Sequence, residues 1–415
     1  MFSPTDSVRN TCRALMGQAK SVLINETALD KFSHEIAQHI YSNQSLQVAE
    51  WDADGWHYTG KTYKQRSCQD NERYDLMRLE RVGLYILSMD AINFCFWPSS
   101  NTKKNGLEYE HLAIALRKVA EIDDGNVDEQ YHSDEGGSGK YVRAESSYAL
   151  SPSNLATLTA TKLKSLLQPH FPPSSEFTVY ELPDIDVRTR LLNELGSGLI
   201  EHHEGSVSNM ISKANNSADA LVNIILESFP GFRDFVDRDS WAKTNNTSCD
   251  WDAAKSSVSV IHFYKRAQIA VADIWAALGR CSTSNQYCHF TDMKLVTTFP
   301  DYRVPQILRQ VGALEYASEL AAKVDNQEEL DEGGVDEVSI RAGTVVAVEE
   351  MVDLVKKNLT DIAQSDSSVQ SKNNLLKLLE DVSAVTIDWY LWQRGEKEDR
   401  MNLLAPHHRV RTTFY

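Results

Sequence analysis

The sequence predicts a mainly α-helical protein with minor β structure. In several long segments apolar residues recur every three or four positions, which is the period of an amphipathic helix, and only two short segments resemble strands. The 415 residues are 42% hydrophobic and 24% charged, a composition typical of folded globular proteins. Because the apolar stripes follow one another without a long linker, we expect a single compact domain over residues 1–415.

The expected elements follow from these periods. Residues 55–64, GWHYTGKTYK, contain a Thr-Gly turn and predict a short hairpin, and residues 176–182, EFTVYEL, predict one strand. We expect a helix that ends at Gly279 and another that ends at Gly395. The segments predicted to be helical are 186–203, 218–229, 264–279, 344–363 and 373–395.

A further helical pair is expected around Gly312. Pro305 suits the first turn of a helix, and Asp301 stands just upstream, where a carboxylate can cap free N–H groups. The stretch VPQILRQVGALEYASEL (304–320) then predicts helix, glycine turn and helix, which is the shape of a helix-hairpin-helix.

Three polar segments interrupt the helical pattern and predict surface insertions. They are acidic, glycine-rich or rich in turn-forming residues, and contain few apolar positions. These segments are residues 121–140, 242–257 and 322–337.

The charge balance bears on possible partners. The formal net charge is −17, with a pI near 5.2. Proteins that neutralise many phosphates are normally basic, at least locally, so a long nucleic acid is not expected as the main partner. A small anionic ligand requires only a few local cations and is compatible with this balance.

The cysteines and the termini indicate a cytoplasmic protein. The six cysteines are scattered, as in a reducing compartment, and Cys281, Cys288 and His289 give only a weak metal signal. No apolar run approaches the roughly 20 residues that span a bilayer. The N-terminal residues lack the apolar core of a secretory signal. We therefore expect a cytoplasmic protein without a membrane partner, and we expect it to be a monomer.

Two stretches concentrate aromatic and charged residues before residue 270. In MDAINFCFWP (89–98), Asn93 and Phe94 belong either to the core or to a slot that stacks a flat heterocycle and hydrogen-bonds its edge. In HFYKRAQI (262–269), Lys265 is either an exposed cation or part of an anion site at a helix start.

Two more stretches contain carboxylates beside rings. Capping explains Asp301 but not the neighbouring Tyr302 and Arg303. In IDWYLWQRG (387–395), Asp388 and Trp392 are four residues apart and share one helix face. If that face is buried, an unpaired Asp388 has a raised pKa and suits acid–base or electrostatic work; otherwise it lies on a wet edge.

Four stretches together resemble one protein family. INFCFW, ESFPGFRD…FYKRAQI, FPDYRVPQILRQVGALEY and IDWYLWQRG…PHHRVRTTFY occur in the order found in the queuosine salvage proteins, from about Ile86 to Tyr415. The resemblance implies hydrolysis of the N-glycosidic bond of queuosine 5′-monophosphate, with release of queuine for reinsertion into tRNA. It also implies a fold similar to the helix-hairpin-helix DNA glycosylases and no cofactor.

The chemistry of that reaction explains the residue types. Cleavage of a ribosyl–base bond passes through an oxocarbenium-like state, which a carboxylate on the sugar face stabilises. A 7-deaza base has carbon in place of N7, so protonation there cannot assist departure. We expect Asp388 to stabilise or attack the sugar cation and Asp301 to position base or water, although these roles are interchangeable at this level.

The resemblance also implies a binding pocket. Phe94, Phe299, Tyr302 and Trp392 are expected around the base, with Asn93 on its edge. Phosphate ligands are expected from bidentate arginine and from lysine as a point charge. These are Lys265, Arg303, His408 and Arg409, with a structural C-terminal contact as the alternative for His408.

Two other functions fit parts of the sequence. A helix-hairpin-helix protein that binds nucleic acid, or a polynucleotide glycosylase, would require a basic face, which the charge of −17 disfavours. A non-enzymatic helical scaffold would use the aromatic stretches only as core.

Overall fold

The stripe of valines in residues 344–363 lies in α15 (Val335–Ser365), a helix of 31 residues. Its first half is buried on nearly all sides, and its second half buries Met351, Val355 and Leu359 on one face. The computed structural model describes residues 3–48, 51, 53–60, 71–97, 104–126, 148–245, 258–279, 288–365 and 369–415.

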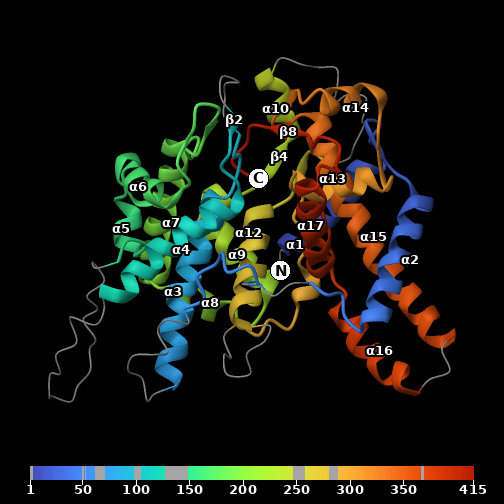
Figure 1. Cartoon of the computed structure of the whole chain (residues 1–415), viewed down its shortest axis with the longest axis horizontal. Coiled ribbons are helices and arrows are strands. Elements are labelled where there is room, and N and C mark those ends of the chain that lie inside the picture. Colours follow the sequence, from blue (N-terminus) through green and yellow to red (C-terminus); the bar gives the residue numbers. More distant parts are fainter. Residues whose placement is uncertain are drawn as a thin grey trace. The chain divides into compact units, whose positions relative to one another are not determined.

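The chain divides into two units, and the first is built around α15. It comprises Met1–Ala49, Asp234–Gln268 and Asp292–Tyr415. Figure 1 shows α15 beside α2 (Glu26–Asn43), and the two helices pack along their apolar faces. The other helices of this unit are α1 (Pro4–Met16), α10 (Arg238–Asn245), the first turn of α12 (Lys265–Ile274), α13 (Arg303–Gln310), α14 (Ser318–Asp325), α16 (Val369–Asp381), α17 (Ala384–Arg400) and the 3-10 turn Met293–Leu295.

Three short strand pairs join distant parts of this unit. β1 (Val22–Ile24) pairs antiparallel with β6 (Leu314–Tyr316), with Val22 opposite Tyr316. The other pairs are antiparallel β4 (Phe235–Asp237) with β5 (Val260–His262), and parallel β7 (Glu329–Leu330) with β8 (Arg409–Val410).

The second unit comprises Glu50–Arg233 and Ile269–Thr291. α7 (Ile185–His203) packs against α5 (Pro152–Ala156) and α3 (Asn71–Ile92). A Cβ on Gly196 would lie 2.4 Å from the Ala156 backbone nitrogen, so glycine allows α5 and α7 to approach closely. The remaining elements are β2 (Lys104–Asn105), α4 (Tyr109–Asn126), α6 (Ala160–Leu167), β3 (Thr178–Val179), α8 (Val207–Lys213), α9 (Ala218–Ser228), the 3-10 turns Gln168–His170 and Pro230–Phe232, the rest of α12 and the π-helix Trp275–Gly279.

The mainly helical fold is confirmed, and four of the five predicted helices match single helical segments. Residues 373–395, however, are two helices, because Ser383 starts α17 with a capping box that includes Thr386. Gly395 does not end the helix: it lies inside α17, where a Cβ would lie 2.6 Å from Cδ of Arg303. This glycine therefore serves close packing.

The segment around Gly312 differs from a simple helical hairpin. Gly312 has a φ of +78°, as expected for a turn glycine, but β6 follows it before α14 begins. Backbone pairing of β6 with β1 has therefore overridden the helical period of residues 314–316. The expected single domain over residues 1–415 stays a prediction.

The remaining local predictions are met only in part. Residues 322–337, where a surface insertion is expected, contain the end of α14, the strand β7 and the start of α15, and most of their side chains are exposed. The strand expected in 176–182 is limited to Thr178–Val179, which pairs with β2. Residues 55–60 form no strand, and the other half of that expected hairpin lies outside the described residues, as do residues 127–140 and 246–257.

Candidate functional site

A buried segment, residues 296–300, leads into α13 and is followed by Asp301. Oδ1 of Asp301 accepts the backbone N–H groups of Arg303, at 2.8 Å, and Val304, at 3.0 Å. These are two of the N–H groups that a helix start leaves without a partner, and Pro305 has none to satisfy. The capping predicted for Asp301 is therefore present.

Asp388 of α17 is bound to the same segment. It is only 4% exposed, and its Oδ2 accepts the Thr298 hydroxyl at 2.5 Å and the Phe299 backbone N–H at 2.8 Å. Both bonds end on one oxygen, and among the described residues no donor reaches Oδ1. The side chain of Phe299 is also buried, and its backbone is what holds the carboxyl group.

The electrostatic environment of Asp388 favours the neutral carboxyl. Burial, helped by the charge of Asp301, raises the pKa of Asp388 to about 8. The bonds from Thr298 and Phe299 and the positive charge of Lys265 act in the opposite direction. Two carboxyl groups and one ammonium group thus interact here, and the titration of Asp388 is moved into the range in which proton transfer is useful.

Lys265 is the first residue of α12 and is 4% exposed. Its backbone N–H donates to Oδ2 of Asp234 at 3.1 Å. One turn later Gln268 accepts the Thr297 N–H at 2.9 Å and donates to the Thr297 hydroxyl at 2.8 Å. These bonds hold the start of α12 against the segment that carries the donors to Asp388.

The guanidinium group of Arg303 donates hydrogen bonds to three side chains of the protein. Its Nε donates to Glu396 at 2.8 Å, Nη1 to Gln306 at 2.7 Å and Nη2 to Asp399 at 3.2 Å. Its pKa is raised, because the neighbouring carboxylates outweigh the effect of burial. This geometry favours a structural link between α13 and α17 over the expected phosphate contact.

Two of the rings expected around the base, Tyr302 and Trp392, lie at the start of α13 and on α17. Tyr302 is half-buried, and its ring lies 4.5 Å from that of His407, with an interplanar angle of 35°. Trp392 is half-buried on α17, one turn after Asp388.

The C-terminal stretch separates the two remaining phosphate candidates. His408 is buried, contacts the Tyr415 hydroxyl at 3.3 Å through Nε2, and has its pKa lowered to about 3 by burial. A neutral imidazole in that position supports the structural alternative. Arg409 is half-exposed in β8.

Asn93 and Phe94 belong to the second unit, directly after α3. Arg188 of α7 lies over the Phe94 ring, 4.1 Å from its centroid, and donates to the carbonyls of Phe94, at 2.6 Å, and Cys95, at 2.8 Å. The ring is buried, and Asn93 is 9% exposed. Arg188 therefore holds both the ring and the backbone of this stretch within the second unit. Cys281 lies outside the described residues, whereas Cys288 is buried, so the weak metal signal stays untested.

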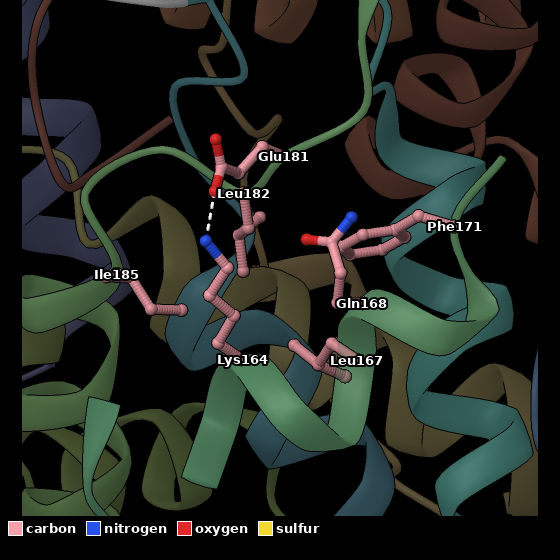
Figure 2. Close-up of a pocket in the computed structure, with 7 residues that line it drawn as sticks. All are labelled: Lys164, Leu167, Gln168, Phe171, Glu181, Leu182 and Ile185. Atoms are coloured by element: carbon pink, nitrogen blue, oxygen red, sulfur yellow. Dashed lines mark hydrogen bonds and ion pairs between the residues drawn. The ribbon is translucent and has the colours of Figure 1, made fainter. Parts of the chain in front are cut away.

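A small hollow of about 40 Å³ lies elsewhere in the second unit. Figure 2 shows Lys164 and Glu181 pointing toward each other across it, where they form an ion pair over the apolar side chains of Leu167, Leu182 and Ile185. It is much smaller than the roughly 300–1,000 Å³ of typical ligand pockets, and none of the predicted site residues lines it.

Several residues in contact with the candidate site were not singled out from the sequence. Thr298 stands in a stretch that was quoted for other residues, and Asp234 ends the motif ESFPGFRD. Arg341 sits among the apolar residues of α15, and Glu396 in a charged helix end. Their partners are remote in sequence, so no local period identifies them.

Comparisons with known proteins match most of the chain to one family. A family model described as "Queuosine salvage protein" matches residues 76–415. Three relatives each bear the name queuosine 5′-phosphate N-glycosylase/hydrolase. One from Dictyostelium discoideum is 31% identical over the full length of both chains, one from Sphaerobacter thermophilus is 30% identical over 81% of this chain and 82% of its own, and one from Bos taurus is 32% identical over 80% and 81%. Because the family model covers most of the chain and a relative matches it over its full length, the chain belongs to the queuosine salvage protein family.

Proposed function

We propose that this protein hydrolyses the N-glycosidic bond of queuosine 5′-monophosphate and releases queuine for tRNA queuosine salvage. The names of its relatives support this reaction. Within this chain, the main structural support is the buried Asp388 and its interaction with Asp301. A carboxyl group held in an apolar setting is suited to stabilise a positive charge that develops only in the transition state.

Asp388 is proposed to act on the sugar. Thr298 and Phe299 fix its Oδ2, and its Oδ1 is then the oxygen that faces the ribose. In this reading Asp388 acts after losing its proton to solvent: as the C1′–N bond breaks, the carboxylate either stabilises the positive charge on the ribose or bonds to C1′, and the base leaves with the electron pair and takes a proton from water. A water molecule then adds to C1′ and completes the hydrolysis. Asp301 then positions the base or the water molecule.

The alternative proposal exchanges the roles of Asp388 and Asp301. With a pKa near 8, Asp388 holds its proton at neutral pH and could instead donate a hydrogen bond to the departing base, while Asp301 serves the sugar. The two readings differ in their pH dependence. A rate that rises with pH toward about 8 supports an ionised Asp388, and a rate that falls over that range supports a protonated one.

Base recognition is proposed for Phe299, Tyr302, Trp392, Phe94 and Asn93. Lys265 is the proposed phosphate ligand, since its charge already acts on Asp388. Arg409 stays a candidate for the phosphate. For Arg303 and His408 the contacts described above favour support of the fold, so any phosphate contact by them is the weaker proposal.

The direct test is to incubate the purified protein with queuosine 5′-monophosphate and to detect free queuine by mass spectrometry. Release that scales with enzyme concentration is expected, and its absence at high enzyme concentration would remove the proposed function. The unphosphorylated nucleoside, run in parallel, measures the contribution of the phosphate.

The rival functions have their own measurements. A polynucleotide reader predicts tRNA binding that weakens steeply with salt, and we expect no such binding from a chain with net charge −17. The monomer, the cytoplasmic location and a likeness of the α13–α14 region to the helix-hairpin-helix of DNA glycosylases stay predictions. None of the described helices combines the length and the apolar composition required to cross a bilayer.

A further inference from the structure

Arg341 of α15 is buried beneath the candidate site and donates to three groups at once. Nη1 and Nη2 bind the two oxygens of Asp234, at 3.0 and 2.5 Å. Nε donates to the Pro300 carbonyl at 3.2 Å, and Nη1 also contacts Glu337 at 3.3 Å. Arg341 and both of its carboxylate partners are at most 2% exposed.

Two of these contacts, to Pro300 and to Asp234, end next to proposed catalytic or binding groups. Pro300 lies between Phe299, whose N–H donates to Asp388, and Asp301, which caps α13. Asp234 accepts the backbone N–H of Lys265 through Oδ2. One guanidinium group therefore joins the start of α12 to the segment that holds both carboxylates.

The start of α12 depends on Asp234 by more than one bond. The Asp234 carbonyl oxygen accepts the N–H groups of Phe263, at 3.0 Å, and Tyr264, at 2.9 Å. Tyr264 has a φ of +51°, an uncommon conformation for a residue with a side chain, immediately before Lys265. A change in the position of Asp234 would thus move the chain that leads into Lys265.

Stability alone does not explain this network. A buried ion pair loses its hydration, and apolar groups of similar volume often stabilise a fold equally well. What the guanidinium group supplies is fixed geometry: a planar fork that binds a carboxylate with two parallel bonds and offers a third nitrogen elsewhere. The rings of Phe263 and Tyr415 hold that plane, with centroids 4.0 and 4.8 Å from Cζ.

We propose that Arg341 is a positioning residue for the glycosidic cleavage: by binding the Pro300 carbonyl and the Asp234 carboxylate together, it sets Asp301 and the donors to Asp388 in place relative to Lys265. The catalytic part of this inference rests on the proposed function. The structural part, that Arg341 fixes residues 298–304 and 263–266, does not.

The test uses Arg341→Lys in the full chain. Lysine keeps the charge but cannot bind Asp234 with two parallel bonds and Pro300 as well. The matched control is Arg309→Lys, on α13, where the half-buried Arg309 makes a two-bond contact with the exposed Asp325 at 2.9 and 3.1 Å. Both variants are compared with the unmodified protein by thermal melting, queuine release and amide hydrogen exchange.

We expect Arg341→Lys to fold, to lose about tenfold or more in kcat, and to exchange faster at the amides of residues 298–304 and 263–266. Arg309→Lys should match the unmodified protein in kcat and in exchange of these segments. A folded Arg341→Lys variant with unchanged kcat and unchanged exchange would overturn the proposal.

A second variant guards against a failure to fold. Asp234→Asn keeps an acceptor oxygen for the Lys265 N–H and weakens the bond to Arg341, and it should show the same pattern to a smaller degree. If neither variant folds, the network serves the fold as a whole and the positioning role is overturned. If the unmodified protein releases no queuine, the proposed function fails, whereas the exchange data still decide whether Arg341 fixes these two segments.

Discussion

Thr298 donates its hydroxyl hydrogen to Oδ2 of Asp388 across 90 positions of sequence, at 2.5 Å, and the Phe299 N–H reaches the same oxygen. The carboxyl group on α17 is therefore oriented by the segment that ends in Asp301. This relationship makes the chemistry of Asp388 sensitive to changes outside its own helix.

Removal of either carboxylate should abolish most of the activity. Asp388→Asn and Asp301→Asn are each expected to remain folded and to lose about 10² or more in kcat, the scale of one lost electrostatic group in an active site. Queuine release is the measurement, with Asp361→Asn on the exposed face of α15 as the control. Normal turnover by both site variants would place the chemistry elsewhere.

The raised pKa of Asp388 predicts how stability depends on pH. Its folded-state pKa lies near 8, above the ordinary 3.8, so the folded state binds this proton more tightly than the unfolded chain does. The resulting stabilisation is full below about pH 4 and is lost as pH rises to about 8.

The melting temperature of Asp388→Asn minus that of the unmodified protein should therefore increase as pH rises from 4 to 8. This difference should level off above pH 8. Calorimetry over pH 4–9 measures it. A difference that stays constant over this range would mean that the carboxyl group is not shifted.

Replacement of Thr298 should move the titration of Asp388. The Thr298 hydroxyl lowers the pKa of Asp388 by bonding its ionised form, so Thr298→Val should raise that pKa and shift the corresponding limb of the pH–rate profile upward. If the ionised form is active, kcat at pH 7 should fall about tenfold, as expected for a hydrogen bond to a charged group.

Thr298→Ser keeps the hydroxyl and should retain the original pH–rate profile. Thr360→Val is the matched control, since the Thr360 hydroxyl bonds only within α15, to the Lys356 carbonyl. An unchanged profile in Thr298→Val would show that this hydrogen bond has no influence on the active form.

Lys265 should determine the preference for the phosphorylated substrate. Lys265→Met removes the buried charge near Asp388, and we expect the ratio of kcat/KM for nucleotide over nucleoside to fall by about tenfold or more, as for a lost charge-assisted bond. Lys357→Met, exposed on α15, should leave the ratio unchanged. Equal ratios in Lys265→Met and the unmodified protein would assign the phosphate to other groups.

Arg303 should affect stability more than specificity. Arg303→Met removes the partner of Glu396 and Asp399, which are partly exposed, and is expected to destabilise the fold by about 2 kcal/mol, the scale of lost hydrogen bonds to charged groups. Chemical denaturation measures this free energy. A normal free energy of unfolding together with a lost nucleotide preference would restore the phosphate role for Arg303.

The helices were predictable because an apolar stripe is a local property: the residues that define α7, α9, α12 and α15 lie within one or two turns of each other. The break at Ser383 and the strand β6 were not recognised, since the first depends on a cap that competes with the apolar period and the second on pairing with residues 22–24. The aromatic and charged motifs were sufficient to identify the family and to nominate Asp301 and Asp388.

The sequence alone thus determined a mainly helical chain, its family and the capping role of Asp301. Only the tertiary structure decided that Asp388 is buried with a raised pKa, that Thr298 and Phe299 orient it, and that Arg303 is held by Glu396 and Asp399. The physical reason is distance along the chain. These side-chain hydrogen bonds of the site join residues 89 to 96 positions apart, and no period within a single segment contains them.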